Sequence, residues 1–128
     1  MDWRAYGVEY ALLFGSRVTG RVFKGDWDIA VKFRRFDLDN YSSLLVDLAK
    51  ELKVREDMID LVPIDENTPC ALILEIERNK KLLYAESFDS FLDDWLKRVS
   101  VCIDFEISKR KLRVLEAMEE AVRKGWEQ

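Results

Sequence analysis

The segment LFGSRVTGRVFKGDWDIAV, residues 13–31, determines the fold that the sequence predicts. The apolar run at residues 8–14 ends at Gly15-Ser16, which is typical of a buried strand followed by a turn. Over residues 26–33 polar and apolar side chains alternate, as in a strand with one buried face and one polar face. The segment therefore predicts two neighbouring strands joined by a loop.

The rest of the chain alternates between helical and strand patterns. An amphipathic pattern at residues 39–52 predicts a helix capped by Asp39 or Asn40. Thr68-Pro69 resembles a helix start with proline at the first helical position. We predict strands over 58–64 and 82–84, a helix from Thr68-Pro69 to about residue 79, and a helical pattern over 87–124 that could break near Ser108.

This order predicts an α/β or α+β fold, with helices packed on a small mixed β-sheet and a long helical C-terminus. We expect one domain over residues 1–128, with a core at about 7–85 and a helical region at about 87–126. Aromatic residues at helical spacing in that region are expected to be core residues, with a groove for a partner as the alternative: Phe88, Phe91, Trp95 and Phe105.

Composition excludes several classes of protein. The chain has 128 residues and no histidine, which rules out catalytic triads that need His and zinc sites that need His. A net charge of −4 argues against a general nucleic-acid binder. No apolar run is long enough for a membrane span and no signal peptide is recognisable, so we expect a cytoplasmic protein. Cys70 and Cys102, which have no CxxC spacing, are expected to be reduced and buried.

Three aspartates suggest a cation site. Asp26 and Asp28 are two residues apart on one strand, so their side chains share a face roughly 6.5–7 Å apart at the backbone. Two like charges at this spacing favour a divalent cation, and without histidine its ligands are oxygens. Asp60, inside the strand at 58–64, would complete a set of three if the strands pair. Such a set can hold two ions for phosphoryl or nucleotidyl transfer.

A phosphate-binding element is expected beside these aspartates. Gly15 allows a ligand to approach the backbone closely, and Ser16 adds a hydroxyl and an N–H donor. Trp27 faces away from the aspartates and is expected in the core. Residues 17–35 are locally basic, which would attract a triphosphate; the cations are Arg17, Arg21, Lys24, Lys32, Arg34 and Arg35.

These residues resemble the signature of the nucleotidyltransferase superfamily that includes DNA polymerase beta. That signature is Gly-Ser after the first strand, Asp-x-Asp after about ten residues, and a third aspartate on a later strand. Here the spacer between Ser16 and Asp26 has nine residues. The small size, the FGSR…DWDIAV form and the tail at residues 81–106 resemble the minimal nucleotidyltransferase (MNT) antitoxins that pair with HEPN ribonuclease toxins. The resemblance covers roughly residues 7–106.

The resemblance implies the nucleotidyltransferase fold and transfer of AMP from ATP to a tyrosine hydroxyl of a partner HEPN toxin. It implies that Asp26, Asp28 and Asp60 bind two Mg²⁺ ions, with Mn²⁺ as an alternative, and that Gly15 and Ser16 hold the triphosphate. Arg17 is expected to contact phosphate or the toxin. Asp60 is expected to complete the coordination of the ion nearer the acceptor hydroxyl and to help remove the proton of that hydroxyl.

Two other functions stay open at the level of sequence. The chain could be an antitoxin that neutralises its toxin by contact alone, or a transferase acting on a small molecule or an RNA end. The intact set of Gly15, Ser16, Asp26, Asp28 and Asp60 favours an enzyme. The sequence also leaves open whether the chain forms a homo-oligomer.

Overall fold

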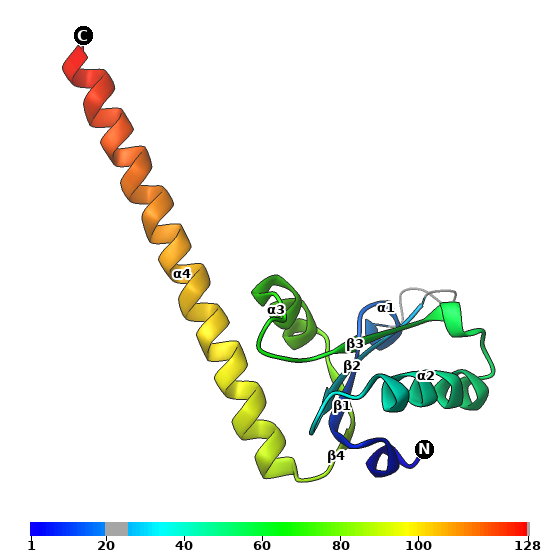
Figure 1. The fold of residues 1–128 in the computed structure, drawn as a ribbon. Coiled ribbons are helices and arrows are strands. Elements are labelled where there is room, and N and C mark those ends of the chain that lie inside the picture. Colours follow the sequence, from blue (N-terminus) through cyan, green and yellow to red (C-terminus); the bar gives the residue numbers. More distant parts are fainter. Residues whose placement is uncertain (20–25, 128) are drawn as a thin grey trace.

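A four-stranded sheet forms the centre of the computed structural model, which describes residues 1–19 and 26–127 (Figure 1). The strand order is β3-β2-β1-β4. β1 (Val8–Phe14) pairs antiparallel with β2 (Trp27–Phe33) and with β4 (Lys81–Ala85). β2 pairs in parallel with β3 (Ile59–Pro63). The mixed sheet and the α/β class predicted from the sequence are confirmed.

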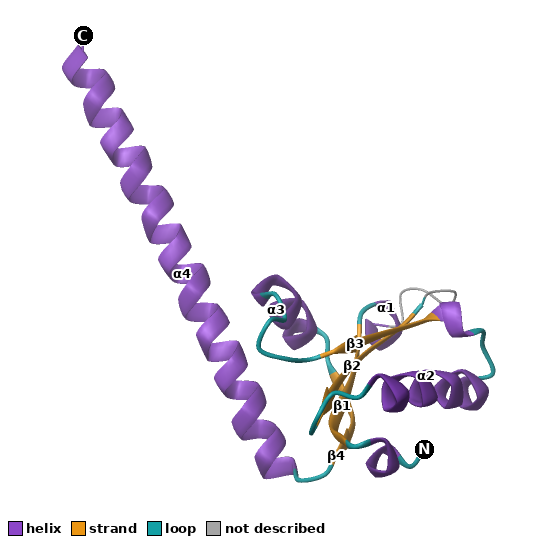
Figure 2. Cartoon of the chain, viewed as in Figure 1, coloured by secondary structure: helices purple, strands orange, loops and turns teal. Residues whose placement is uncertain are grey.

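Helices cover both faces of the sheet (Figure 2). Side chains alternate along β1, so Ala11 and Leu13 belong to one core and Leu12 and Phe14 to the other. α2 (Leu38–Leu52) closes the first core, while α3 (Cys70–Arg78) and the first part of α4 (Phe88–Glu127) close the second. The three remaining elements are short: η1 (Trp3–Tyr6), α1 (Ser16–Thr19) and η2 (Glu56–Met58).

The N-terminal caps of α2 and α3 differ from the prediction. The cap of α2 is Asp37, not Asp39 or Asn40, and its Oδ1 accepts the backbone N–H of Asp39 at 2.8 Å. Asp37 has an extended backbone, which leaves its carboxylate free to reach over the first turn. In α3 Pro69 is itself the cap, and the Thr68 hydroxyl accepts the N–H of Asp65 instead.

α4 is continuous from Phe88 to Glu127, without a break at Ser108, and its C-terminal part extends away from the body (Figure 1). Phe91 and Trp95 are buried against the sheet, as predicted. Phe88 and Phe105 are 57% and 53% exposed, so their assignment to the core was wrong. Nothing among the described helices, this one included, is long and apolar enough to cross a membrane.

Hydrogen bonds join the root of α4 to the sheet and to α3. The Tyr10 hydroxyl donates to Asp94 Oδ2 at 2.6 Å, and the Arg98 Nε donates to the same oxygen at 2.9 Å. Burial, and then the bond to Asp94, hold the pKa of Tyr10 well above its ordinary value, so its hydroxyl stays a donor. Trp95 Nε1 donates to Glu77 Oε2 at 2.5 Å. The first turns of α4 are therefore held in one orientation.

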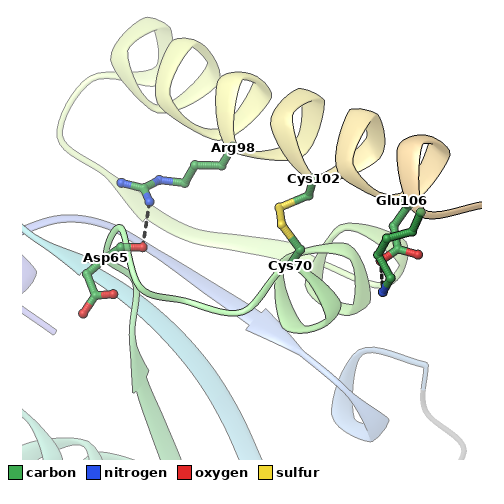
Figure 3. The surroundings of a disulfide bond; sticks show 6 residues. Asp65, Cys70, Arg98, Cys102 and Glu106 are labelled. Carbon is green, nitrogen blue, oxygen red and sulfur yellow. Dashed lines mark hydrogen bonds and ion pairs between the residues drawn. A yellow bond between two sulfur atoms is a disulfide. The ribbon is translucent and has the colours of Figure 1, made fainter. Parts of the chain in front are cut away.

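A disulfide between Cys70 and Cys102 joins α3 to α4 (Figure 3). The two Cα atoms lie 5.2 Å apart although 32 positions separate them in the sequence. The prediction of two reduced cysteines was therefore wrong. Sequence spacing gave no signal for the bond, because it depends on how the first turn of α3 meets the buried face of α4.

Removing this disulfide should lower stability. A cross-link that closes a loop of 32 residues restricts the unfolded chain and contributes about 3–4 kcal/mol in the chain-entropy model. We expect the double variant Cys70→Ser/Cys102→Ser to lose about that much free energy of unfolding in a urea titration.

The matched measurement is the unchanged protein titrated with and without dithiothreitol, which should reproduce the loss. Two reactive thiols in the denatured, unreduced protein would contradict the disulfide.

Candidate active site

The candidate site begins where β1 ends. Gly15 follows Phe14 with a φ of +77°, in the left-handed region that favours glycine, and Ser16 opens α1. This turn brings the backbone back beside β2, because Phe14 and Asp28 are partners across the β1–β2 ladder. Gly15 and Asp28 therefore meet although twelve residues separate them in the sequence.

Gly15 leaves no room for a side chain on the side of Asp28. A Cβ built on Gly15 would lie 2.3 Å from Asp28 Oδ2 and 3.2 Å from its Cγ. The left-handed backbone favours glycine here, and a side chain at this position would have to displace the carboxylate of Asp28. The predicted meeting of the Gly-Ser turn with the aspartates is thus seen for Gly15 and Asp28.

Asp28 and Asp60 lie side by side in the parallel register of β2 and β3. Neighbouring strands are about 4.8 Å apart, so the two side chains leave the sheet next to each other. The residues that flank them, Ile29 and Leu61, point into the core under α2, so the aspartates lie on the opposite face, the face of α3. Asp26 is exposed and directly precedes β2.

The electrostatics of Asp28 show an accumulation of negative charge. Burial is the largest cause that raises its pKa above the ordinary value, followed by the charges of Asp60, Asp26 and Glu75. Glu75, an exposed residue of α3, was not predicted as part of the site. No motif marks it, because its position depends on how α3 packs over the sheet.

The donor set fits a divalent cation in its chemistry. Hard oxygen ligands and uncompensated like charges are what Mg²⁺ or Mn²⁺ would stabilise. Across residues 1–19 and 26–127, however, no three carboxylate or cysteine side chains gather closely enough to form a complete ligand set. The structure brings Asp28 and Asp60 together, and the role of Asp26 as a third ligand stays a prediction.

Arg17 lies against an aromatic ring. Its guanidinium carbon is 4.6 Å from the centre of the Trp27 ring, within the range of a cation–π contact. Trp27 packs on the core under α2, as predicted from the alternation in β2. The predicted contact of Arg17 with phosphate or a toxin stays a prediction.

Two residues of the basic stretch predicted around the site, Lys32 and Arg34, lie away from the aspartates. Lys32 pairs with Glu9 at 3.8 Å, and Arg34 pairs with Glu86. Lys32 follows Asp28 by four residues, about 13 Å along an extended strand, so these cations lie at the other end of β2. The predicted contributions of Arg21 and Lys24 fall outside the described residues.

Comparison with known proteins shows which family the chain resembles. The family model described as "Polymerase beta, Nucleotidyltransferase" matches residues 4–89, which include every residue of the candidate site. No curated protein matches the chain.

Solved structures share the fold over most of the chain. A toxin–antitoxin complex with AMP-PNP is 21% identical, with a TM-score of 0.63 over 91% of this chain and 92% of its own. An MntA–HpeT toxin–antitoxin mutant is 20% identical, with the same TM-score and coverage. A tri-AMPylated Shewanella oneidensis HEPN toxin in complex with MNT antitoxin is 23% identical, with a TM-score of 0.59 over 90% and 88%.

The close approach of Asp28 to Gly15 predicts that alanine substitutions at Gly7, Gly15 and Gly125 change the free energy of unfolding by different amounts. Gly15→Ala should lose about 1–2 kcal/mol for the left-handed backbone, and a further amount for displacing the carboxylate of Asp28. Gly7→Ala has a similar φ of +72° but only a 3.8 Å contact, so it should show the backbone cost alone. Gly125→Ala lies in α4 with no neighbour within 4 Å and should be neutral or stabilising. Equal losses for Gly15→Ala and Gly7→Ala in urea titrations would contradict the contact.

The raised pKa of Asp28 predicts that its charge opposes folding. Above that pKa the folded state holds the ionised carboxylate unfavourably, so Asp28→Asn should be more stable than the unchanged protein at pH 7 without metal. The gain should disappear as the pH falls below the ordinary aspartate value of 3.8, where Asp28 is protonated in both states.

The measurement is the thermal midpoint of both proteins between about pH 3 and 8. Asp93→Asn, which removes an exposed carboxylate paired with Lys97 on α4, is the control and should give no such gain. An Asp28→Asn variant that is less stable at pH 7 would overturn the electrostatic account.

Proposed function

The chain belongs to the polymerase beta nucleotidyltransferase family, and from this premise we propose that it transfers AMP from Mg-ATP to a tyrosine hydroxyl of a partner HEPN ribonuclease toxin, acting as its antitoxin. The observation that carries the proposal is the meeting of Gly15, Asp28 and Asp60 at one end of the sheet. This is where the family signature requires a glycine turn and carboxylates from two strands to converge.

Each residue of the site has a distinct role in the proposal. Gly15 and Ser16 would hold the triphosphate with backbone N–H groups and a hydroxyl, since a glycine allows a ligand to approach the backbone closely. Asp26, Asp28 and Asp60 would hold Mg²⁺. When bound, the metal would neutralise phosphate charge and lower the pKa of the acceptor hydroxyl.

The reaction exchanges one P–O bond for another. The acceptor oxygen forms a bond to the α-phosphorus of ATP, the bond to the bridging oxygen of the β-phosphate breaks, and pyrophosphate leaves on the opposite side. Asp60 takes the hydroxyl proton and passes it to solvent. The chain's contribution is mostly placement of the two reactants and stabilisation of charge.

The choice of acceptor is supported by the structural neighbours. One contains a HEPN toxin that carries AMP groups together with an MNT antitoxin, and another contains AMP-PNP. A tyrosine hydroxyl on a protein can approach carboxylates that are exposed at one end of the sheet. The exposed positions of Asp26 and Asp60 are compatible with this.

The decisive test is transfer of label from α-³²P-ATP with magnesium to a cognate HEPN protein. The unchanged chain should label the HEPN protein, and Asp28→Asn should reduce the initial rate by about 100-fold or more. Asp93→Asn serves again as the matched control and should keep full activity, because Asp93 lies on an exposed face of α4.

Three other outcomes separate the alternatives. A stable complex without label would replace the proposal with an antitoxin that acts by contact alone. Neither complex nor label on the HEPN protein, but label on a small molecule or RNA, would replace the acceptor. Full activity of Asp28→Asn would overturn the assignment of the site.

A further inference from the structure

The C-terminal part of α4 exposes apolar side chains along its whole length. Beyond Cys102 the helix leaves the body and points into solvent (Figure 1). Phe105 is 53% exposed and Trp126 is 90% exposed. Such a surface is unusual for an isolated helix, because apolar patches of this extent generally mark an interface.

Part of this surface follows a strict spacing. Eight positions from residue 101 onward are separated alternately by four and three residues, and six of them are apolar. We call this set the distal seam: Val101, Phe105, Ser108, Leu112, Leu115, Glu119, Val122 and Trp126. An apolar 4-3 repeat over more than three heptads is the pattern of a coiled coil.

The distal seam is separate from the face of α4 that packs on the body. The body-facing residues are Phe91, Trp95, Val99 and Cys102, all buried. At 3.6 residues per turn, the seam lies roughly a third of a turn around the helix from that face. The body therefore does not cover the seam, and a second helix can reach it over about 39 Å, the length of 26 helical residues.

We propose that the distal seam pairs with the same seam of a second copy of this chain, as a parallel two-stranded coiled coil. Phe105, Leu112, Glu119 and Trp126 take the first core position of the heptad, and Val101, Ser108, Leu115 and Val122 take the second. The proposal concerns α4 alone and does not depend on the proposed transferase activity.

Charge complementarity favours a second copy over other occupants. In a parallel pair, the residue directly before a first core position lies close to the other helix. It faces the residue of that helix whose number is higher by five. Asp104 would then face Lys109 of the second copy, and Lys111 would face Glu116. Two-fold symmetry repeats both pairs, so the seam is flanked by four opposite-charge contacts.

Contacts within the single helix are compatible with this arrangement. The Lys109 ammonium lies 5.4 Å from the centre of the Phe105 ring, so it already covers the edge of the seam. Glu119, the charged residue within the seam, pairs with Arg123 of its own helix at 2.9 Å. In the parallel pair Glu119 would face Glu119 of the second copy, so these like charges would weaken the pair, and Ser108 would add little apolar contact.

The first test is the mass of the purified protein in solution without nucleotide. Sedimentation equilibrium over about 1–100 µM should show a shift from the monomer mass of 15.1 kDa towards twice that mass. The double variant Leu112→Asp/Leu115→Asp should remain monomeric throughout. It should keep its fold, because both residues are exposed and distant from the body.

The second test probes the register by exchanging charges. Lys111→Glu and Glu116→Lys should each weaken association about tenfold, because each turns two attractive contacts of the dimer into repulsive ones. The double variant Lys111→Glu/Glu116→Lys should restore the original association. Arg110→Glu is the matched control: it makes the same charge change one residue away, on the outer face of the helix, and should have little effect.

Each contrary result overturns a defined part of the proposal. A monomer at every concentration would overturn self-association. A HEPN complex that the unchanged chain forms and Leu112→Asp/Leu115→Asp does not would assign the seam to that partner instead. Dimers of Leu112→Asp/Leu115→Asp would place the interface elsewhere. A double charge variant that stays as weak as the single variants would overturn the parallel register.

Discussion

The parallel pairing of β2 with β3 is the constraint on which the candidate site depends. It sets Asp28 beside Asp60, and it does so because Ile29 and Leu61 bury their side chains under α2. A slip of β3 by one residue would turn Leu61 to the opposite face of the sheet and the carboxylate of Asp60 into the core under α2. Packing of one face of the sheet therefore fixes the chemistry of the other.

This arrangement concentrates like charges where a purely structural protein would avoid them. Burial and neighbouring carboxylates raise the pKa of Asp28, and Gly15 brings the backbone directly against it. The strands around the site are apolar, and Leu12 and Ala30 are fully buried. Burial of this apolar surface stabilises the fold and offsets the unfavourable electrostatic free energy of Asp28. Unfavourable electrostatics at a well-packed sheet is typical of a functional site.

The sequence predicted those features whose pattern is local. The apolar run of β1 and the alternation in β2 identified those strands, and with them Gly15 and Asp28, while the apolar run at residues 58–64 placed Asp60 on a third strand. The Asp37 cap was missed because it depends on a backbone conformation, and Glu75 because it reaches the site through the packing of α3. The Cys70–Cys102 bond and the pairing of Lys32 and Arg34 at the far end of β2 depend on contacts between distant segments. Phe105 was misjudged because apolar periodicity does not say what covers a helix face.

The Cys70–Cys102 bond also closes a covalent ring that contains α3, β4 and the root of α4. β4 is an edge strand, and edge strands are the first parts of a sheet to fray or to pair with another molecule. Inside the ring, β4 cannot separate from β1 over any distance without moving two packed helices. The bond thus restricts the movement of an edge strand to which neither cysteine belongs.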